Sequence, residues 1–477
     1  MRLYDTMSRT VRTVETAHPQ FARIYACGPT VYRDAHVGNM RTFLMTDLIT
    51  RSLQYQGIRT QVVQNITDVG HMANDTGLGD NLDINPDDGQ AGTEDKVLAE
   101  ATSSGVTALE IAAHYESAFH RDLASLNIYP ADSYPKASES IDSMITLIEE
   151  LIESGHAYVG TDATVYFDAQ SFPSYGALSG NKLDQLKPGH RFDLDDTDNA
   201  KRFHADWALW KVAGSERTQL TWETPWGRGF PGWHTECSAM SLQLLGDMID
   251  IHTGGIDLRF PHHEDERAQS NSAAGREVVG HWVHAEHLLF ENRKMSKSSG
   301  NVVLVSDVMA RGYDPLALRL AFLQHRYRSQ MNLTWDVIAS ANDQLQKWRT
   351  KVNEWSTSPS APMAQEYLDR FTDLFFDDLN TPLAINELRA LERDADVADG
   401  AKCETFIHLD RLLGLDLARD IGKSTSVPPE ISDLLSEREQ ARAAKDWAAS
   451  DRIRDQIAEL GFTVQDTAQG QEITSAH

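Results

Sequence analysis

The spacing of apolar residues at the start of the chain predicts a strand–helix–strand unit. Residues 21–26 and 59–66 form two largely apolar runs of strand length. Between them, residues 37–56 have an apolar face at helical spacing, and Gly57 follows as a helix stop. That face consists of Met40, Phe43, Leu44 and Leu48. Open α/β sheets bind ligands at the carboxyl ends of their strands, so we expect a binding site just after residue 26.

The middle of the chain predicts an insertion that divides this sheet into two halves. The stretch 175–198 within it is irregular and rich in Gly, Asp and Lys. The regular elements are expected in this order: helix 93–126 with a break at 103–105, helix 140–154, and a hairpin of strands 157–159 and 164–167.

The second half of the chain resumes the sheet and then becomes helical. We expect the sheet to continue around residues 232–240 and 248–257, and a further helix to carry residues 262–266. Long helical patterns then follow at 314–325, 335–355, 364–379, 382–395 and about 430–460, with breaks at 356–362 and 424–429 and a short strand at 461–466. The predicted fold class is α/β: a Rossmann-like parallel-sheet catalytic domain split by an insertion and followed by an all-α helical C-terminal region.

Composition narrows the class of protein. The chain has 477 residues, too many for one hydrophobic core, and contains no apolar run of about 20 residues that would span a membrane. The first residues lack an apolar signal core, so we expect a cytoplasmic protein. Three cysteines exclude a disulfide framework. The net charge of −27 counts against nucleic acid unless basic residues gather locally, as they do at residues 325–328 and 347–351.

Two short stretches could bind phosphate. A Gly-Pro turn follows the first strand, and the next helix opens on His36, Gly38 and Asn39. A helix N-terminus offers unpaired N–H groups to phosphate, and His36 and Asn39 add donors about one turn apart. Far along the chain, Lys294 and Lys297 lie in a basic loop whose charges could stabilise a polyphosphate in a reaction.

A metal site is a further possibility. Cys27 follows the first strand, Cys237 lies in the second half, and His262 and Glu266 share one face of a helix at i, i+4 spacing. Thiolates, imidazole and carboxylate suit zinc. Spacing alone leaves two alternatives open: the cysteines are simply buried apolar groups, or other side chains are the ligands. Those rival ligands are His234, His252, His263 and Glu264.

An acidic, Gly-rich loop covers residues 74–94. Four of its residues stand at positions 1, 3, 5 and 12 of a calcium-loop spacing: Asp83, Asn85, Asp87 and Glu94. Asp88 occupies the sixth position, where such loops require Gly. The sequence therefore favours a surface excursion over a calcium site.

Several motifs in a fixed order resemble those of one family. Residues 25–32 (Tyr-Ala-Cys-Gly-Pro-Thr-Val-Tyr), 65–68 (Asn-Ile-Thr-Asp) and 231–240 (Pro-Gly-Trp-His-Thr-Glu-Cys-Ser-Ala-Met) are three of them. The rest are 260–264 (Phe-Pro-His-His-Glu), 294–301 (Lys-Met-Ser-Lys-Ser-Ser-Gly-Asn), 327–330 (Tyr-Arg-Ser-Gln) and 444–451 (Ala-Lys-Asp-Trp-Ala-Ala-Ser-Asp). Almost the whole chain is similar to the cysteinyl-tRNA synthetases, which are class I aminoacyl-tRNA synthetases.

The resemblance implies a zinc-dependent amino-acid site. It assigns one Zn²⁺ per chain to Cys27, Cys237, His262 and Glu266, and it places the amino acid against Cys27, Gly28, Thr67 and Trp233. A shape pocket discriminates poorly between cysteine and serine, whereas zinc prefers a thiolate to a hydroxyl. No editing domain is then needed.

The resemblance also implies an ATP site, with Mg²⁺ accompanying ATP. It assigns catalysis to His36, Asn39, Lys294 and Lys297. ATP contacts fall to Thr30, His36, Gly38, Asn39, Gly254, Gly255, Asp257 and Lys297. Asn39 departs from the family's usual His at that position, and we expect an altered rate more than a lost function.

The implied activity joins L-cysteine to the 3′ end of tRNA(Cys) through cysteinyl-adenylate, releasing AMP and diphosphate. The partners are tRNA(Cys), ATP and L-cysteine, with no membrane, and a monomer is expected. The expected divisions are the first half of the Rossmann catalytic domain (1–118), an inserted connective domain (119–225), the second half of the catalytic domain (226–290), the lysine loop and stem-contact region (291–335), a helical tRNA-binding bundle (336–423) and a C-terminal anticodon-region segment (424–477).

One rival shares most of these features. A ligase joining activated cysteine to an amino sugar would keep the zinc and ATP motifs, but it would not need the helical C-terminal third. Because every proposed ATP, zinc and cysteine contact lies at or before residue 301, we expect a chain cut before 356–362 to retain adenylate formation, provided that it folds.

Overall fold

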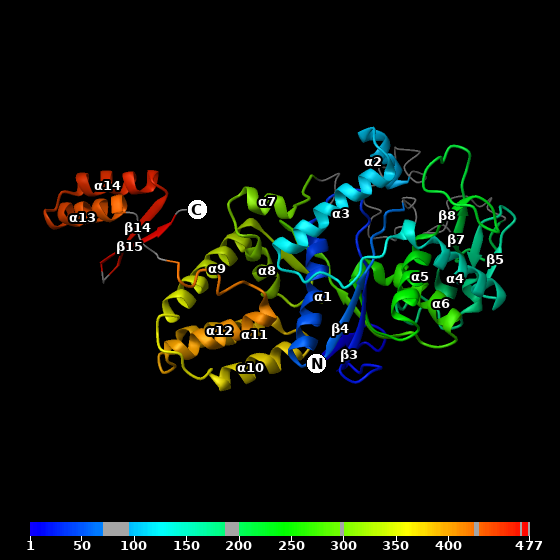
Figure 1. Cartoon of the computed structure of the whole chain (residues 1–477), viewed down its shortest axis with the longest axis horizontal. Helices are drawn as coiled ribbons and strands as arrows, with labels where there is room; N and C mark the ends of the chain where they lie inside the picture. The colour runs from blue at the N-terminus through cyan, green and yellow to red at the C-terminus, as the bar shows by residue number, and fades with distance from the viewer. Residues whose placement is uncertain (70–94, 187–199, 296–299, 424–428, 468–469, 476–477) are drawn as a thin grey trace. The chain divides into compact units, whose positions relative to one another are not determined.

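The computed structural model describes residues 1–69, 95–186, 200–295, 300–423, 429–467 and 470–475. The chain forms two compact units, Met1–Arg419 and Asp420–His477, which we treat separately (Figure 1).

A four-stranded parallel sheet lies at the centre of the first unit. Its strand order is β10–β9–β3–β4, and the strands are β3 (Phe21–Ala26), β4 (Arg59–Gln64), β9 (Ile249–Gly255) and β10 (Val279–Ala285). Helix α1 (Val37–Tyr55) joins β3 to β4, as the apolar pattern predicts, and buries its four predicted core residues. The chain leaves β3 toward β4 on one side, while β9 pairs with β3 on the other. The carboxyl end of β3 is therefore the switch point where α/β sheets bind ligands.

The segment between β4 and β9 builds a second sheet. It is antiparallel, in the order β5–β6–β7–β8, and its strands are β5 (Ala157–Val159), β6 (Val165–Phe167), β7 (Trp207–Val212) and β8 (Gly229–Pro231). The hairpin of β5 and β6 is confirmed. The helices of this region are α2 (Lys96–Ser104), α3 (Ala108–Ser125), α4 (Ile141–Glu153), and the short η3 (Ala137–Glu139), η4 (Ala169–Ser171) and η5 (Leu183–Gln185).

The prediction that the sheet resumes around residues 232–240 is wrong. These residues begin helix α5 (Trp233–Leu245), and the sheet continues only at β9. The side chains of α5 are buried on almost every side of the helix, so its sequence lacks the polar stripe that marks a surface helix. The predicted helix over residues 262–266 is confirmed as α6 (His262–Ala274), and the short η6 (Ile256–Arg259) leads into it.

The rest of the first unit is mainly helical. The predicted helices occur as α8 (Pro315–Leu323), α9 (Trp335–Trp355), α10 (Gln365–Phe376) and α11 (Thr381–Arg393). The sequence analysis did not identify α7 (Val305–Ala310) or α12 (Asp399–Leu413). The remaining strands are the hairpin β1 (Arg2–Asp5) and β2 (Thr10–Thr13), and the small sheet of β11 (Leu288–Phe290), β12 (Arg293–Lys294) and β13 (Met331–Leu333). In Figure 1 the antiparallel strands β5–β8 lie on one side of β3 and β4, and α8–α12 lie on the other.

The second unit contains two helices and a hairpin: α13 (Pro429–Ala443), α14 (Trp447–Glu459), β14 (Phe462–Thr467) and β15 (Gly470–Ser475). The single helix predicted over about 430–460 is wrong, because Lys445 adopts a left-handed φ of 57° and Asp446 caps a new helix. The predicted strand at 461–466 is confirmed. The C-terminal region is helical through α12, and this last unit adds a two-stranded sheet.

Among the described residues, no helix has both the length and the apolar character needed to cross a bilayer.

Candidate active site

Four side chains predicted as metal ligands converge beside the end of β3. One ligand atom from each of Cys27, Cys237, His262 and Glu266 lies within 4.8 Å of the others. The four residues come from the end of β3, from α5, and from the first turn and a half of α6, and each is at most 5% exposed. Two thiols, an imidazole and a carboxylate at this spacing could hold a metal ion.

Three histidines predicted as alternative ligands lie in contact with these four side chains. His234 Nδ1 lies 2.7 Å from His262 Nδ1, and His252 Nε2 lies 3.0 Å from Glu266 Oε2. His263 Nε2 lies 3.2 Å from Cys27 Sγ. Polar groups in contact with metal ligands orient them and tune their basicity. Cys27, His252, His263 and Glu266 also meet the 4.8 Å criterion, so geometry alone leaves a second ligand set open.

Glu264, the fourth rival ligand, is turned away from this cluster. Its Oε2 accepts a hydrogen bond of 2.7 Å from the backbone N–H of Ser179 in the inserted region. Its Oε1 lies 3.5 Å from Arg267 Nη1. Glu264 therefore ties α6 to the insertion.

The cluster concentrates negative charge where a cation would sit. A hydrogen bond from Cys27 lowers the pKa of Cys237 to about 6, while burial and the same contact raise the pKa of Cys27. Burial alone would lower the pKa of His262, but the charges of Glu266 and Cys237 raise it to about 10. Burial opposes ionisation of Glu266 as well, yet His252 and His262 hold its pKa well below the usual range. Glu266 and Cys237 thus favour their anionic forms here.

The predicted phosphate donors cap one helix reciprocally. His36 is the N-cap of α1: its Nδ1 accepts from the N–H of Asn39 at 3.2 Å, and Asn39 Oδ1 accepts from the N–H of His36 at 3.1 Å. Because Nδ1 accepts, a neutral His36 carries its proton on Nε2. Because the Asn39 oxygen accepts, its amide nitrogen presents donors. Both side chains therefore have a donor atom that is not used in the cap.

Met295 and Val303, which flank the lysine loop within the described residues, meet the start of α1, although the two stretches are far apart in sequence. A Cβ on Gly38 would lie 3.0 Å from Cε of Met295 and 2.9 Å from Cε1 of His36, so only glycine fits between them. The N–H of Val37 donates to the carbonyl of Val303 at 2.9 Å. Lys294 ends β12, and Asn301 Nδ2 donates to its carbonyl at 3.0 Å. Lys297 lies outside the described residues, as do residues 74–94 with their calcium-like spacing.

The predicted amino-acid contacts surround the same strand end. Gly28 donates its N–H to Asn65 Oδ1 at 2.8 Å, and a Cβ there would lie 1.7 Å from the carbonyl oxygen of Asn65. Thr30 and Thr67 form a parallel bridge. The ring of Trp233 lies over that of His262, with centroids 4.2 Å apart.

The three predicted adenosine contacts lie at the carboxyl end of β9. A Cβ on Gly254 would lie 2.6 Å from Cε1 of His263, and a Cβ on Gly255 would lie 2.3 Å from Oδ1 of Asp257. Both glycines therefore allow a side chain to approach the backbone closely.

The two predicted basic patches are largely neutralised by ion pairs. Arg328 Nε lies 2.5 Å from Asp378 Oδ2, and Lys347 Nζ lies 2.6 Å from Glu392 Oε1. Lys351 pairs with Glu354 at 2.9 Å. These patches carry less net positive charge than the sequence suggests.

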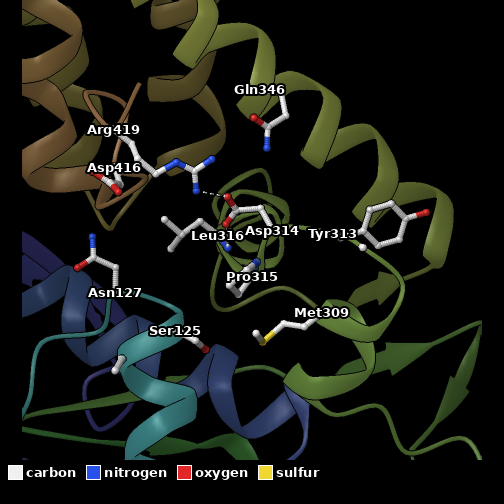
Figure 2. Close-up of a pocket in the computed structure, with 12 residues that line it drawn as sticks. Ser125, Asn127, Met309, Tyr313, Asp314, Pro315, Leu316, Gln346, Asp416 and Arg419 are labelled. Carbon is white, nitrogen blue, oxygen red and sulfur yellow. Dashed lines mark hydrogen bonds and ion pairs between the residues drawn. The ribbon is translucent and has the colours of Figure 1, made fainter. Parts of the chain in front are cut away.

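A groove of about 710 Å³ lies among α3, α7, α8 and α9, away from the cluster (Figure 2). Asp314 Oδ2 and Arg419 Nη1 form an ion pair of 2.6 Å across it. Of the predicted site residues that the structure describes, none lines this groove. We assign no reaction to it.

Comparison with known proteins identifies the family. A family model for the tRNA synthetases class I (C) catalytic domain matches residues 13–74 and 90–343, and one for the cysteinyl-tRNA ligase anticodon binding domain matches residues 424–473. A cysteine–tRNA ligase of Thermus thermophilus is 38% identical over 98% of each chain. The chain belongs to the cysteine–tRNA ligase family. The interruption of the first match falls within the acidic loop of residues 74–94.

Other relatives agree with this assignment. The cysteine–tRNA ligase of Protochlamydia amoebophila is 36% identical, covering 98% of this chain and 97% of its own. Among solved structures, methionyl-tRNA synthetase of Mycobacterium tuberculosis bound by methionyl-adenylate has a TM-score of 0.53 at 15% identity, covering 90% of this chain and 96% of that one. The ternary complex of LeuRS, tRNA and LeuAMS from Agrobacterium radiobacter K84 has a TM-score of 0.58 at 10% identity over 84% of each chain. These structural likenesses establish the α/β fold of class I synthetases.

Membership of the cysteine–tRNA ligase family makes this chain a class I aminoacyl-tRNA synthetase, as the motifs predict. The full-length coverage and the anticodon-domain match give no support to the amino-sugar ligase, which needs neither.

The sequence did not predict that these histidines contact the candidate metal ligands. His284 was not predicted as a site residue. His252 and His284 lie in β9 and β10, parallel strands that are fully buried toward their carboxyl ends. Histidine inside a buried parallel strand is unusual and was the available signal.

Proposed function

We propose that Cys27, Cys237, His262 and Glu266 hold one Zn²⁺ and that this ion selects cysteine. The convergence of their four ligand atoms within 4.8 Å carries the proposal. The donor set fits zinc, because soft thiolates combine with an imidazole and a carboxylate. A bound zinc ion supplies a site that accepts the substrate's thiolate and rejects the hydroxyl of serine. Trp233, beside His262, forms a wall of the pocket, and Gly28 and Thr67 contact the amino acid.

The two ligand sets can be separated by one substitution, because Cys237 belongs only to the proposed set. Cys237→Ala should lose zinc, as measured by metal analysis, and should raise the cysteine concentration needed for activity. Cys403→Ala is the matched control, since Cys403 is a third buried cysteine, located in α12. A Cys237→Ala protein that keeps its zinc would point to Cys27, His252, His263 and Glu266 instead.

The ATP site is proposed to lie between the N-terminus of α1 and the lysine loop. His36 Nε2 and the Asn39 amide donate to the triphosphate, at the positive end of the helix dipole. Lys294 and Lys297 neutralise the pyrophosphate as it leaves, and Mg²⁺ accompanies ATP. Thr30, Gly38, Gly254, Gly255 and Asp257 frame the nucleotide. The contacts between Gly38, His36 and Met295 support this arrangement, since they bring both signatures together.

The reaction proceeds in two steps on this surface. The carboxylate of cysteine attacks the α-phosphorus of ATP, and cysteinyl-adenylate and pyrophosphate form. The 3′-terminal ribose hydroxyl of tRNA(Cys) then attacks the acyl carbon, and AMP leaves. The chain contributes mainly by holding the reactants in line and by stabilising charge as it develops.

The C-terminal segment 424–477 is proposed to read the anticodon. Trp447 at the start of α14 is 58% exposed, and an exposed ring is a platform on which single-stranded bases stack. Residues 1–118 and 226–290 form the halves of the catalytic domain, with 119–225 inserted between them. The lysine loop and stem-contact region 291–335 and the bundle 336–423 follow.

We further propose a cytoplasmic monomer. All the proposed contacts come from one chain, and the three cysteines are unpaired, as is usual in a reducing compartment.

Cysteine-dependent exchange of pyrophosphate into ATP, measured with and without tRNA, tests the proposal as a whole. Exchange with cysteine, but not with serine, together with charging of tRNA(Cys), is the expected result. Exchange that proceeds equally with serine would remove the case for zinc selection.

A further inference from the structure

A chain of buried hydrogen bonds runs from Cys27 to the N-terminal hairpin. Cys27 Sγ lies 3.2 Å from His263 Nε2, and His263 Nδ1 lies 2.9 Å from His284 Nε2. His284 Nδ1 in turn lies 2.7 Å from Oγ1 of Thr6. All four residues are buried.

The thiolate at the Cys27 end fixes the direction of this chain. A metal-bound Cys27 is a thiolate, which can only accept a hydrogen bond. His263 must then donate through Nε2–H. A neutral imidazole carries one N–H, so His263 Nδ1 accepts from His284 Nε2–H. His284 Nδ1 accepts in turn, and the hydroxyl of Thr6 donates to it.

We propose that the hydroxyl of Thr6 is a positioning group for the metal site, because it satisfies the outer nitrogen of His284 in the tautomer that keeps the N–H of His263 directed at Cys27. Thr6 touches no proposed ligand itself and acts only through His284 and His263. The inference rests on the proposed zinc site and adds to it a residue from an element that none of the sequence motifs includes.

The alternative tautomers show why one hydroxyl matters. Without it, His284 Nδ1 would be a buried acceptor with no donor from Thr6, which is costly. If His284 moved its proton to Nδ1, its Nε2 would become an acceptor and His263 would have to donate through Nδ1. His263 Nε2 would then direct a lone pair at the thiolate, and attraction would become repulsion.

The backbone of the hairpin holds Thr6 in place for this role. The N–H of Thr6 donates to the carbonyl of Trp282 at 2.8 Å, and the N–H of Trp282 donates to Asp5 Oδ1 at 3.1 Å. Asp5 also accepts from the N–H of Ser8 at 3.0 Å. These hydrogen bonds join Thr6 to Trp282 of β10, two residues before His284.

The test compares zinc retention in full-length proteins purified with zinc. Thr6→Val removes the hydroxyl and keeps the shape of the side chain, whereas Thr6→Ser keeps the hydroxyl. Thr10→Val is the matched control, because Thr10 lies on the same hairpin and its hydroxyl forms a hydrogen bond of 3.0 Å with that of Ser8, away from the histidines. The readouts are the rate of zinc release to excess chelator and the thiolate-to-metal charge-transfer band of the cobalt-substituted protein.

We expect Thr6→Val to release zinc about three- to tenfold faster, less than the 10- to 100-fold effect of removing a group that touches a ligand directly. Its cobalt band should shift. Thr6→Ser and Thr10→Val should behave like the wild type. If Thr6→Val does not fold, as judged by circular dichroism, Thr6→Ala is measured in its place.

Two outcomes would overturn the inference, and they are distinguishable. Wild-type protein with one zinc ion, and a folded Thr6→Val protein that releases it at the wild-type rate with an unshifted band, would refute the role of Thr6 alone. Wild-type protein without zinc would refute the proposed zinc site, and the role of Thr6 with it.

Discussion

At the scale of single residues, the candidate metal cluster combines side chains spaced along one helix with side chains that packing brings in from other elements. The spacing of His262 and Glu266 on one helix face could be predicted, because helical periodicity is local. The backing of Cys27 by His263, and of Glu266 by His252, could not, because it depends on how α6 packs against β3 and β9. Likewise, the reciprocal cap of His36 and Asn39 is consistent with the proposed role of Asn39, because its oxygen completes the cap and its amide remains a donor.

Asn39→Asp tests whether the amide of Asn39 donates to phosphate while its oxygen caps the helix. Aspartate keeps an oxygen for the N–H of His36 but replaces the amide donor with negative charge. We expect the maximal rate of pyrophosphate exchange to fall by about 100-fold, the usual effect of losing one donor to a developing charge. Asn39→His should retain most activity. A wild-type rate for Asn39→Asp would contradict the proposed phosphate contact.

Asp122 in α3 makes stability depend on pH. Burial, and then the nearby charge of Asp34, raise the pKa of Asp122 to about 6 from 3.8. A raised carboxyl pKa favours the protonated folded state, so this group costs stability as pH rises from about 4 to 6, and the cost is constant above that. We expect Asp122→Asn to raise the free energy of unfolding by roughly 1–2 kcal/mol at pH 7.5, after allowance for solvent screening, and by less at pH 5.

Denaturant unfolding of Asp122→Asn at both pH values is the measurement. Glu149→Gln, on the exposed face of α4, is the control substitution and is measured in the same way. An equal effect of Asp122→Asn at pH 5 and pH 7.5 would exclude ionisation of Asp122 as the cause.

At the scale of elements, prediction succeeded where a repeating apolar pattern was followed by a clear stop signal such as Gly57. Helix α1 and strands β3 and β4 were predicted almost to the residue, because their apolar patterns have a single period. Helix α5 is buried on nearly all sides and has no such period, so it was mistaken for a return of the sheet. The break between α13 and α14 depends on the left-handed backbone of Lys445, which no pattern of apolar residues reveals.

The turn between α13 and α14 presents Trp447 to solvent. We expect Trp447→Ala to weaken tRNA binding by about 1–3 kcal/mol, the usual cost of losing one stacked base, and therefore to reduce tRNA charging. Pyrophosphate exchange should be unchanged. Leu460→Ala is the control, since Leu460 is an exposed apolar residue of the same unit. Parallel charging and exchange assays give the answer, and a loss of exchange in Trp447→Ala would count against a role confined to tRNA.

At the scale of the whole molecule, the helical third is more closely bound to the catalytic body than the order of motifs suggests. Arg319 of α8 donates to the carbonyl of Leu413 at 2.6 Å and pairs with Asp47 of α1 at 2.5 Å. Arg51 of α1 donates to the carbonyl of Arg411 at 3.1 Å. One hydrophobic core includes residues of α1, α9 and α12. Sequence motifs cannot reveal this, because the contacts join residues more than 90 positions apart.

A chain that ends before residues 356–362 would lack the carbonyl groups of Arg411 and Leu413 that Arg51 and Arg319 bind. We therefore expect this shorter chain not to fold. A chain ending at residue 423 keeps α12 and should form cysteinyl-adenylate at nearly the wild-type rate while losing most tRNA charging. Pyrophosphate exchange and charging, measured on both truncated chains after circular dichroism, check this. Full charging by the longer of the two would show that residues 424–477 are not needed to bind tRNA.

That shared core also determines how the molecule melts. Since α1, α9 and α12 cannot lose one another without exposing the same apolar residues, the first unit should unfold cooperatively, and the small second unit, with its own core of Ile431, Ile453, Ile457 and Val464, should unfold by itself. Unfolding enthalpy scales with length at about 0.7 kcal/mol per residue. Scanning calorimetry should therefore record two transitions with enthalpies in a ratio of roughly seven to one, and only the smaller one should vanish from a chain that ends at residue 423.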